Sequence, residues 1–288
     1  MMTTPIRLLI AGCGDLGMRV ARRVLQNPIN RVWGLRRTRP EAPEGLPGLT
    51  WFEADLAQPE TMKNLPTGIT HILFSAAPNA RTESDYRAVY FDGLRNVVQN
   101  AYSSALKRVL FVSSTAVYGE HGAEWVNEDT PVNPKNFNGR VLLETEQWLS
   151  TFGREHALTT LSLRLSGIYG PGRTALLEKL KLGQVGAPSS AAHWSNRIHV
   201  DDAAAAVVHL MEFEHPQSTY LITDSTPLSM RTLYEALAQQ VGGPVPAVSE
   251  SPAFVGSKRL SNARLRETGF IFQWPDSRDG YRNIIQAG

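Results

Sequence analysis

Residues 6–17 read IRLLIAGCGDLG, and this stretch decides the fold. The apolar run from Ile6 to Ala11 has the length and the continuous hydrophobicity of a strand that is covered on both faces. A Gly-x-Gly-x-x-Gly sequence follows directly, and it opens a segment whose apolar residues are spaced as in a helix. The order of strand, glycine loop and helix predicts the first unit of a parallel α/β sheet.

The three glycines of this loop have distinct expected uses. Gly12 allows a tight turn, Gly14 lets the backbone approach a diphosphate, and Gly17 lets the helix pack close to the strand. Free N–H groups at the helix N-terminus would bind the phosphates, so Asp15 and Leu16 belong to the same predicted cofactor site. The alternative is an ordinary turn between a strand and a helix.

The pattern of strand and helix continues along the chain. Apolar runs of strand length recur at residues 31–35, 49–53, 71–75, 108–113 and 158–165, with helical stripes at 86–101 and 141–152. This alternation predicts an α/β fold, a doubly wound parallel Rossmann sheet in residues 1–165. Residues 166–288 are expected to form a smaller C-terminal α/β substrate lobe that does not fold independently. Its predicted elements are a strand near 220–223 and helices from Asp201, Ser229 and Ser261, the last helix of the chain.

Composition excludes several classes of protein. With 42% hydrophobic and 19% charged residues among 288, the chain is neither disordered nor fibrous. A net charge of +2 without long basic blocks argues against nucleic acid, and no apolar run approaches the roughly 20 residues that cross a membrane. The one cysteine, Cys13, predicts a reducing cytoplasm and a small side chain filling the glycine loop, although a redox sensor is an alternative.

The end of the second predicted strand indicates which dinucleotide binds. The sequence there, Gly34-Leu35-Arg36-Arg37-Thr38, has no carboxylate to accept from ribose hydroxyls. Arg36 and Arg37 could instead pair with a 2′-phosphate, which favours NADP over NAD, although a solvated basic turn is the alternative. Asp55, followed by Leu56, could hold the adenine amino group or simply cap a turn.

Several segments in order resemble the NAD(P)-dependent epimerase/dehydratase group, the extended and atypical short-chain dehydrogenase/reductases. The likeness covers nearly the whole chain, and the matching segments are AGCGDLG (11–17), ADL (54–56), SAAP (75–78), VSSTAVYGE (112–120), RLSGIYGPGR (164–173) and NRIHVDDAAAA (196–206). The resemblance implies oxidoreductase or isomerase chemistry, mainly on nucleotide sugars.

The resemblance also implies roles for single residues. Ser114 falls where the family keeps the hydroxyl that hydrogen-bonds the reacting substrate oxygen, and Ala76 and Ala77 fall in a loop that lines the cofactor. Tyr169 falls beside nicotinamide and substrate, and Arg173 is placed to meet a substrate phosphate. The polar stretch 183–196, with Asn196 and Arg197 at its end, is expected to contact the substrate. His193 and His199 lack a third metal ligand, so no metal is expected.

One departure from the family pattern concerns catalysis. The family uses a Tyr-x-x-x-Lys pair, but the aligned positions here are Asn138 and Leu142, and no Tyr-x-x-x-Lys occurs anywhere in the chain. Asn138 cannot shuttle a proton near neutral pH. Three interpretations follow: an enzyme with a displaced acid/base, for which Tyr118, Tyr169 and Tyr86 are candidates; a non-catalytic NADP(H) sensor; or a scaffold. The helices predicted at 84–105 and 140–152 could also form a homodimer.

Overall fold

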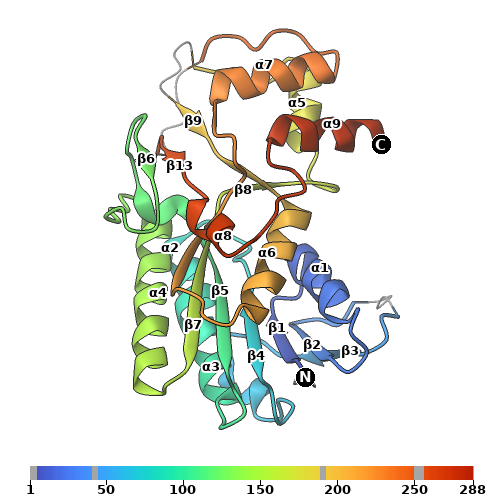
Figure 1. Cartoon of the computed structure of the whole chain (residues 1–288), viewed down its shortest axis with the longest axis vertical. Coiled ribbons are helices and arrows are strands. Elements are labelled where there is room, and N and C mark those ends of the chain that lie inside the picture. The colour runs from blue at the N-terminus through green and yellow to red at the C-terminus, as the bar shows by residue number, and fades with distance from the viewer. Residues whose placement is uncertain (1–4, 41–44, 189–192, 250–255, 288) are drawn as a thin grey trace. The chain divides into compact units, whose positions relative to one another are not determined.

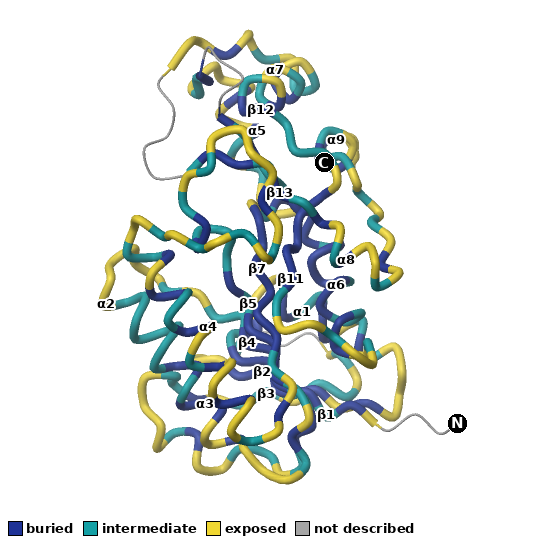
Figure 2. Tube along the Cα trace, turned by 60° about the vertical axis from the view of Figure 1, so that its left-hand side comes forward, coloured by how far each residue is buried: buried dark blue, intermediate teal, exposed yellow. Residues whose placement is uncertain are grey.

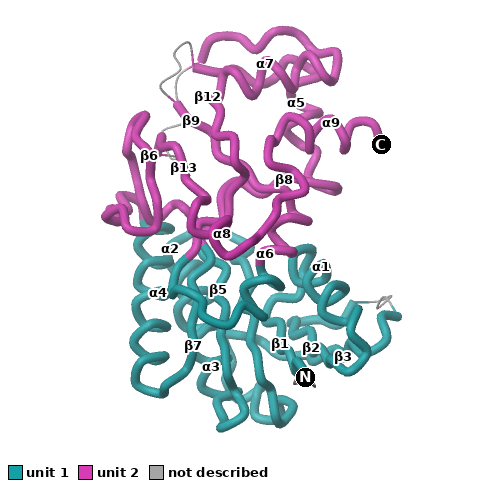
Figure 3. The backbone as a smooth tube through the Cα atoms, viewed as in Figure 1, with its two compact units in different colours: residues 1–113, 137–163, 207–219 teal, residues 114–136, 164–206, 220–288 magenta. Residues whose placement is uncertain are grey.

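The computed structural model describes residues 5–40, 45–188, 193–249 and 256–287 (Figure 1). Backbone contacts divide the chain into two compact units (Figure 3). The first comprises residues 1–113, 137–163 and 207–219, and the second comprises residues 114–136, 164–206 and 220–288. The two units are therefore interleaved along the chain, unlike the linear division at residue 165 predicted from the sequence. That division, and the prediction that the lobe does not fold alone, stay predictions.

The largest sheet has seven strands in the order β11-β7-β5-β4-β1-β2-β3. Every strand pair from β3 to β5 is parallel. The chain starts at β1 and runs outward first to β3 and later, from β4, toward the other edge, so the order reverses between β1 and β4. The strands are β1 (Arg7–Ala11), β2 (Arg31–Arg36), β3 (Leu49–Glu53), β4 (His71–Phe74), β5 (Arg108–Ser114), β7 (Thr159–Leu165) and β11 (Thr219–Ile222).

The central strands of this sheet form where side chains are buried almost without interruption, whereas the edge strand β3 has only intermediate and exposed residues. Leu8, Leu9, Ile10 and Ala11 are all fully buried, as expected for a sheet with helices on both faces. Figure 2 shows buried residues following the strands of this sheet. The helices whose apolar stripes cover it are α1 (Asp15–Val24), α3 (Leu94–Ala101), α4 (Phe137–Glu155) and α6 (Val200–Glu212). The doubly wound α/β sheet predicted from the sequence is confirmed.

The helical stripe predicted over residues 86–101 is one helix with a wide turn inside it. It begins as α2 (Glu83–Tyr86), capped by the Thr82 side chain, which accepts from the Asp85 N–H. A π-helical stretch from Arg87–Gly93 leads into α3. Such wide turns are uncommon and often lie at functional sites.

The second unit contains short strand pairs and helices. β8 (Gly167–Tyr169) pairs in parallel with β10 (Arg197–His199), β9 (Trp194–Ser195) pairs antiparallel with β12 (Leu228–Ser229), and β6 (Trp125–Val126) pairs in parallel with β13 (Arg259–Leu260). The remaining helices are α5 (Ala175–Lys181), α7 (Met230–Gln240), α8 (Ala263–Glu267) and α9 (Ser277–Ala287). Within the described residues, no helix is long and apolar enough to cross a membrane.

Two sequence predictions about this unit are corrected. The helix predicted from Ser261 begins at Ala263 with Asn262 as its N-cap, and it is not the last helix of the chain, because α9 follows. The helix α5 was not predicted at all. Its buried residues Leu177 and Leu180 pack in a core with residues of α7 and α9, so contacts between distant segments stabilise a helix of only seven residues.

One buried histidine should make folding depend on pH. His71 begins β4, its Nδ1 lies 2.8 Å from Oγ1 of Thr70, and burial, assisted by the cations Arg108 and Lys107, lowers its pKa from 6.5 to about 4. The unfolded chain therefore takes up a proton between pH 6.5 and about 4 that the folded chain does not. The free energy of unfolding should fall as the pH drops through this window and be fully recovered above it.

We expect His71→Gln to remove that part of the loss, on the order of 3 kcal/mol, because glutamine does not titrate. Urea unfolding at a series of pH values measures the slope. His215→Gln is the matched control, since the His215 side chain is 88% exposed and should leave the slope unchanged. Equal slopes for His71→Gln and the unaltered protein would contradict the assignment.

Candidate functional site

The glycine loop after β1 touches the loop after β4 through the backbone. Gly12 has φ of +82°, and a Cβ on it would lie 2.3 Å from the Cα of Ala76. The Ser75 side chain donates to the Gly12 carbonyl at 3.1 Å, and the Ser75 N–H donates to the Ala11 carbonyl at 2.9 Å. Position 12 therefore needs glycine both for its left-handed backbone and for this close approach.

The N-terminus of α1 is bare at Gly14. Gly14 is the N-cap residue, it provides no side-chain cap, and a Cβ on it would meet no atom within 4 Å. Gly17, in contrast, packs against β1, because its Cβ would lie 2.9 Å from the Cγ2 of Ile10. The first-turn N–H groups of a helix have no acceptor within the helix. Open space beside such donors fits an anionic group such as a diphosphate.

The other residues of the loop support this geometry. The Asp15 carboxylate is held by Arg19 at 2.8 Å. Leu16 is buried against the sheet side of α1. Burial raises the pKa of the Cys13 thiol to about 12, so it stays protonated, and it lies 3.6 Å from the Met18 sulfur. These properties favour the interpretation of Cys13 as a packing residue over a redox sensor.

The predicted adenosine residues lie at the ends of β2 and β3. Arg36 and Arg37 are exposed at the end of β2. The Asp55 Oδ1 accepts from the Ala57 N–H at 3.0 Å, which fits the turn-capping alternative. The Leu56 carbonyl accepts from Asn96 at 2.9 Å. Because β1 to β4 are parallel neighbours, these residues, the glycine loop, Ala76 and Ala77 share the carboxyl edge of one sheet.

The face of α4 to which the sequence resemblance assigns the family's catalytic pair carries Asn138, Leu142 and Glu146. Asn138 lies in the first turn of α4, and Leu142, one turn later, is 3% exposed. One further turn along, Glu146 is buried and its Oε1 accepts from the Ser113 hydroxyl at 2.5 Å. This face therefore offers an amide and a buried apolar side chain where a phenol and an ammonium group are expected.

Tyr86 contacts the residue that precedes Asn138. Its ring meets the Phe137 ring edge-on, with centroids 5.3 Å apart. The neighbouring Arg87 forms two hydrogen bonds with Glu144 of α4, at 2.9 and 2.6 Å. This pair holds α2 against α4 and keeps the Tyr86 ring beside the start of α4.

In the second unit, Ser114 and Tyr118 bound one short 3-10 turn. Ser114 is its N-cap, and the Ser114 Oγ accepts from the Ala116 N–H at 3.2 Å, so its proton stays available for donation. Tyr118 is fully buried, and its hydroxyl accepts from Arg164 at 2.7 Å. The role of Tyr118 as acid/base stays a prediction, and this burial does not favour it.

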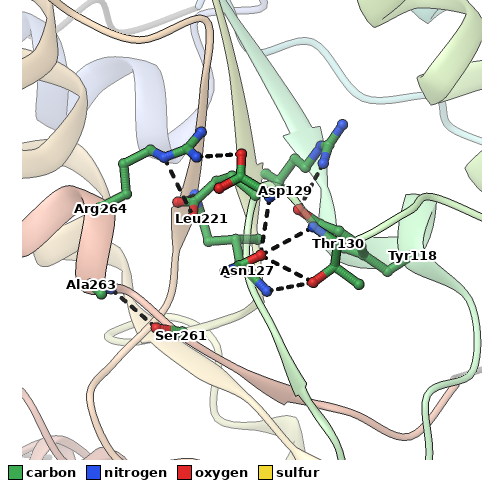
Figure 4. A network of polar contacts seen from close by, with 10 residues as sticks. Tyr118, Asn127, Asp129, Thr130, Leu221, Ser261, Ala263 and Arg264 are labelled. Atoms are coloured by element: carbon green, nitrogen blue, oxygen red, sulfur yellow. Dashed lines mark hydrogen bonds and ion pairs between the residues drawn. The ribbon is translucent and has the colours of Figure 1, made fainter.

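A polar network fixes the segment that follows this turn (Figure 4). The Glu128 side chain is 2% exposed, accepts from the Leu221 N–H at 2.8 Å and lies 3.7 Å from the Arg264 Nε. Burial raises the pKa of Glu128. Arg264 also pairs with Asp129 at 2.6 Å, so α8 and β11 both hold residues 127–130.

The predicted substrate residues of this unit are mostly engaged in structure. The Tyr169 hydroxyl is buried with no hydrogen-bond partner within the described part of the chain, and burial raises its pKa. A Cβ on Gly280 would lie 2.1 Å from it. The Asn196 amide group clamps the backbone of residues 258 and 260, at 2.9 Å each. Arg173 is exposed and Arg197 is partly buried. Their substrate roles stay predictions, and residues 189–192 of the predicted substrate stretch lie outside the described residues.

Further polar groups of this unit include histidines, aspartates and a lysine. Among the described residues, no group of three or more metal-ligand side chains gathers. The Asp202 carboxylate, in the first turn of α6, accepts from the N–H groups of Gln273 and Trp274 at 2.9 and 2.8 Å. Trp51 and Lys258 were not singled out by sequence. Burial lowers the pKa of Lys258 to about 8, and its Nζ donates to the Gly119 carbonyl at 2.9 Å.

Comparison with known proteins agrees with this geometry. Residues 8–222 match the model of the NAD dependent epimerase/dehydratase family. Protein YeeZ of Escherichia coli K12 is 31% identical over 191 residues, which cover 65% of this chain and 66% of that relative. The chain thus spans about two thirds of the length of that curated relative.

Solved structures match over more of the chain. A Methylobacillus flagellatus protein named as a candidate NAD-dependent epimerase/dehydratase is 37% identical, with 98% of each chain covered and a TM-score of 0.82. The UDP-glucose 4-epimerase of Thermus thermophilus, solved with NAD, is 21% identical, with 98% of each chain covered and a TM-score of 0.80. At 21% identity, the match to the Thermus thermophilus enzyme shows a shared fold alone.

Substitution by alanine should lower the stability of the protein strongly at Gly12 and hardly at all at Gly14. Gly12→Ala must push a Cβ into the Ala76 backbone and strain φ, so we expect it to destabilise the protein by about 3 kcal/mol. Gly14→Ala meets open space and should change stability by less than about 1 kcal/mol. Chemical unfolding of both variants measures the difference. A Gly12→Ala protein as stable as the unaltered chain would contradict the close approach of the two loops.

Proposed function

The chain belongs to the NAD-dependent epimerase/dehydratase family, and from that premise we propose that it is an NADP(H)-binding enzyme of the epimerase, dehydratase or reductase type. We take its substrate to be a small molecule of the nucleotide-sugar type, with the proton handled by a displaced residue. The observation that carries the proposal is the bare α1 N-terminus at Gly14, where a Cβ would meet nothing within 4 Å, beside a loop locked by Gly12. That arrangement supports binding of a dinucleotide diphosphate.

The proposed cofactor residues divide by the part of the dinucleotide that they would meet. The backbone of residues 12–17 would hold the diphosphate, Arg36 and Arg37 would pair with a 2′-phosphate, and Asp55 and Leu56 would face the adenine. Ala76 and Ala77 would line the loop beside it. When bound, the nicotinamide supplies hydride transfer. Two arginines without an acidic neighbour in the same turn support NADP over NAD.

Tyr86 is the displaced acid/base that the geometry favours. Tyr118 is fully buried and bonded to Arg164, and Tyr169 is buried against α9. Tyr86 is only partly buried, and its ring contact with Phe137 keeps it beside the start of α4, near Asn138. We therefore assign proton transfer with the substrate oxygen to the Tyr86 phenol.

Ser114 and Arg173 complete the proposal in the second unit. The Ser114 hydroxyl, whose oxygen already accepts from Ala116, would donate its proton to a substrate oxygen. The exposed Arg173 would meet a substrate phosphate. The nucleotide-sugar class rests on the family resemblance and on the fold shared with UDP-glucose 4-epimerase.

A non-catalytic NADP(H) sensor is the second candidate. The observation that favours it is Leu142, which is 3% exposed at the position of the family's lysine, so an apolar side chain stands one turn from position 138. A sensor needs the glycine loop but neither Ser114 nor Tyr86. Turnover separates the two candidates.

Cofactor binding tests the glycine loop directly. Calorimetric titration should give micromolar or tighter binding of NADPH and clearly weaker binding of NADH at one fixed salt concentration. We expect Gly14→Asp to weaken NADPH at least about 100-fold, because a carboxylate would occupy the phosphate position. Gly14→Ala is the matched control for folding. Full NADPH affinity in a folded Gly14→Asp protein would exclude this loop as the diphosphate site.

Turnover tests the proposed acid/base. With the first substrate found in a panel of nucleotide sugars and small ketones, Tyr86→Phe should lower kcat by about 10² to 10⁴ without changing NADPH affinity. Tyr90→Phe is the matched control, because burial raises the pKa of the neighbouring Tyr90 to about 12 and it holds its proton. Ser114→Ala should also lower kcat. A Tyr86→Phe protein with unaltered kcat would remove Tyr86 from the mechanism, and absence of turnover across the panel would favour the sensor.

A further inference from the structure

The Trp51 ring of β3 lies over the neighbouring strand β2 at Gly34, which has no side chain. A Cβ on Gly34 of β2 would lie 2.8 Å from Cζ3 and 3.0 Å from Cε3 of the Trp51 ring on β3. The same Cβ would lie 3.1 Å from the Cys13 sulfur. The Trp51 indole therefore packs over the backbone of β2, on the face of the sheet that carries the glycine loop.

Arg36 stands on that same face. It follows Gly34 by two residues along β2, and alternate residues of a strand share a face. Its guanidinium carbon lies 6.0 Å from the centroid of the Trp51 ring, and its charge lies close enough to Cys13 to oppose the rise of the pKa of that thiol. The guanidinium thus rests over an indole at the carboxyl end of β2, beside the loop proposed to hold the diphosphate.

We propose that Trp51 is a specificity-determining residue, and that its ring holds Arg36 in position to bind the 2′-phosphate of NADP(H). A guanidinium stacked on an indole loses little further freedom on binding, and its in-plane N–H groups stay available for two hydrogen bonds to a phosphate. This inference rests on the proposed function and names the group that orients its arginine.

Packing contacts of the ring faces, and not a hydrogen bond from the N–H group, hold the Trp51 ring in place. The Trp51 Nε1 is buried and has no hydrogen-bond partner among the residues that the structure describes. Burial of a donor without an acceptor costs stability, so hydrogen bonding does not explain why the ring lies there. A phenylalanine at position 51 would keep an aromatic face under Arg36 and would avoid that cost.

The carboxylate of Glu53 would oppose the binding of a 2′-phosphate at Arg36. Glu53 pairs in register with Arg36 across β2 and β3, and it shares the strand face of Trp51. Its carboxylate would repel a 2′-phosphate, whereas it could accept from the free 2′-hydroxyl of NAD. Glu53→Gln should therefore strengthen NADPH binding and weaken NADH binding. The opposite pair of changes would count against a phosphate bound at Arg36.

The test compares adenosine 2′,5′-bisphosphate with 5′-AMP by calorimetry. We expect Trp51→Leu to lower the preference for the bisphosphate, taken as the ratio of the two Kd values, by about 3- to 10-fold. Trp51→Phe should restore the ratio to within about 2-fold. In an Arg36→Ala background, Trp51→Leu should leave the ratio unchanged, because no guanidinium remains to be held. A purely structural tryptophan would change both affinities equally and leave the ratio untouched.

Trp33 supplies the matched control. It lies on β2 as well, its position alternates with Gly34 and so faces the other side of the sheet, and its ring lies 5.0 Å from the guanidinium carbon of Arg7. Trp33→Leu removes a cation contact of the same kind from the neighbouring strand and should leave the ratio unchanged. An equal fall in the ratio for Trp33→Leu would show a general loss of sheet order and overturn the proposal.

The outcomes also separate this inference from the proposed function. If the unaltered protein prefers NADPH and Trp51→Leu leaves the ratio unchanged, the inference alone fails. If the unaltered protein binds neither NADPH nor NADH, the proposed function fails and the inference fails with it. If it binds both dinucleotides equally and Arg36→Ala changes neither affinity, the glycine loop stands and the role of the arginine and of Trp51 is excluded.

Discussion

The rest of this structure depends on the backbone contact between Gly12 and Ala76. No side chain fits between them, and hydrogen bonds from Ser75 close the contact on both sides of Gly12. The contact lies where the strand order reverses between β1 and β4, the place where an open α/β sheet binds its ligands. By fixing the turn, it aims α1 so that the bare first turn at Gly14 faces open space.

The residues proposed to bind the cofactor and the residues at the start of α4 lie on different elements of this chain. The residues proposed to hold the dinucleotide sit at the carboxyl ends of β1 to β4, where the sheet itself fixes their positions. The face of α4 that carries Asn138, Leu142 and Glu146 presents an amide, a buried apolar side chain and a carboxylate held by Ser113. Because the proposed cofactor residues and this face of α4 lie on different elements, a change on α4 need not alter the cofactor residues.

Local patterns predicted most of the sheet and less of the second unit. The strands β1 to β5 and β7 were predicted within one or two residues because each is a short run rich in apolar and β-branched residues, and β3 matches at both ends. The helix α9 was not predicted, since its Tyr281 is buried by stacking on the distant Tyr169. In the candidate site, the glycines and arginines were readable from one segment. The role of Trp51 was not, because it appears only when the register of β2 with β3 is known.

The central claim is that the first turn of α1 binds the diphosphate of the dinucleotide. Hydrogen exchange of the full chain, measured by mass spectrometry with and without saturating NADPH, tests it on the amides concerned. The account predicts that NADPH slows exchange in peptides covering residues 12–18, because bound phosphate oxygens would occupy those N–H groups. NADPH binding that leaves exchange across residues 12–18 unchanged would contradict it.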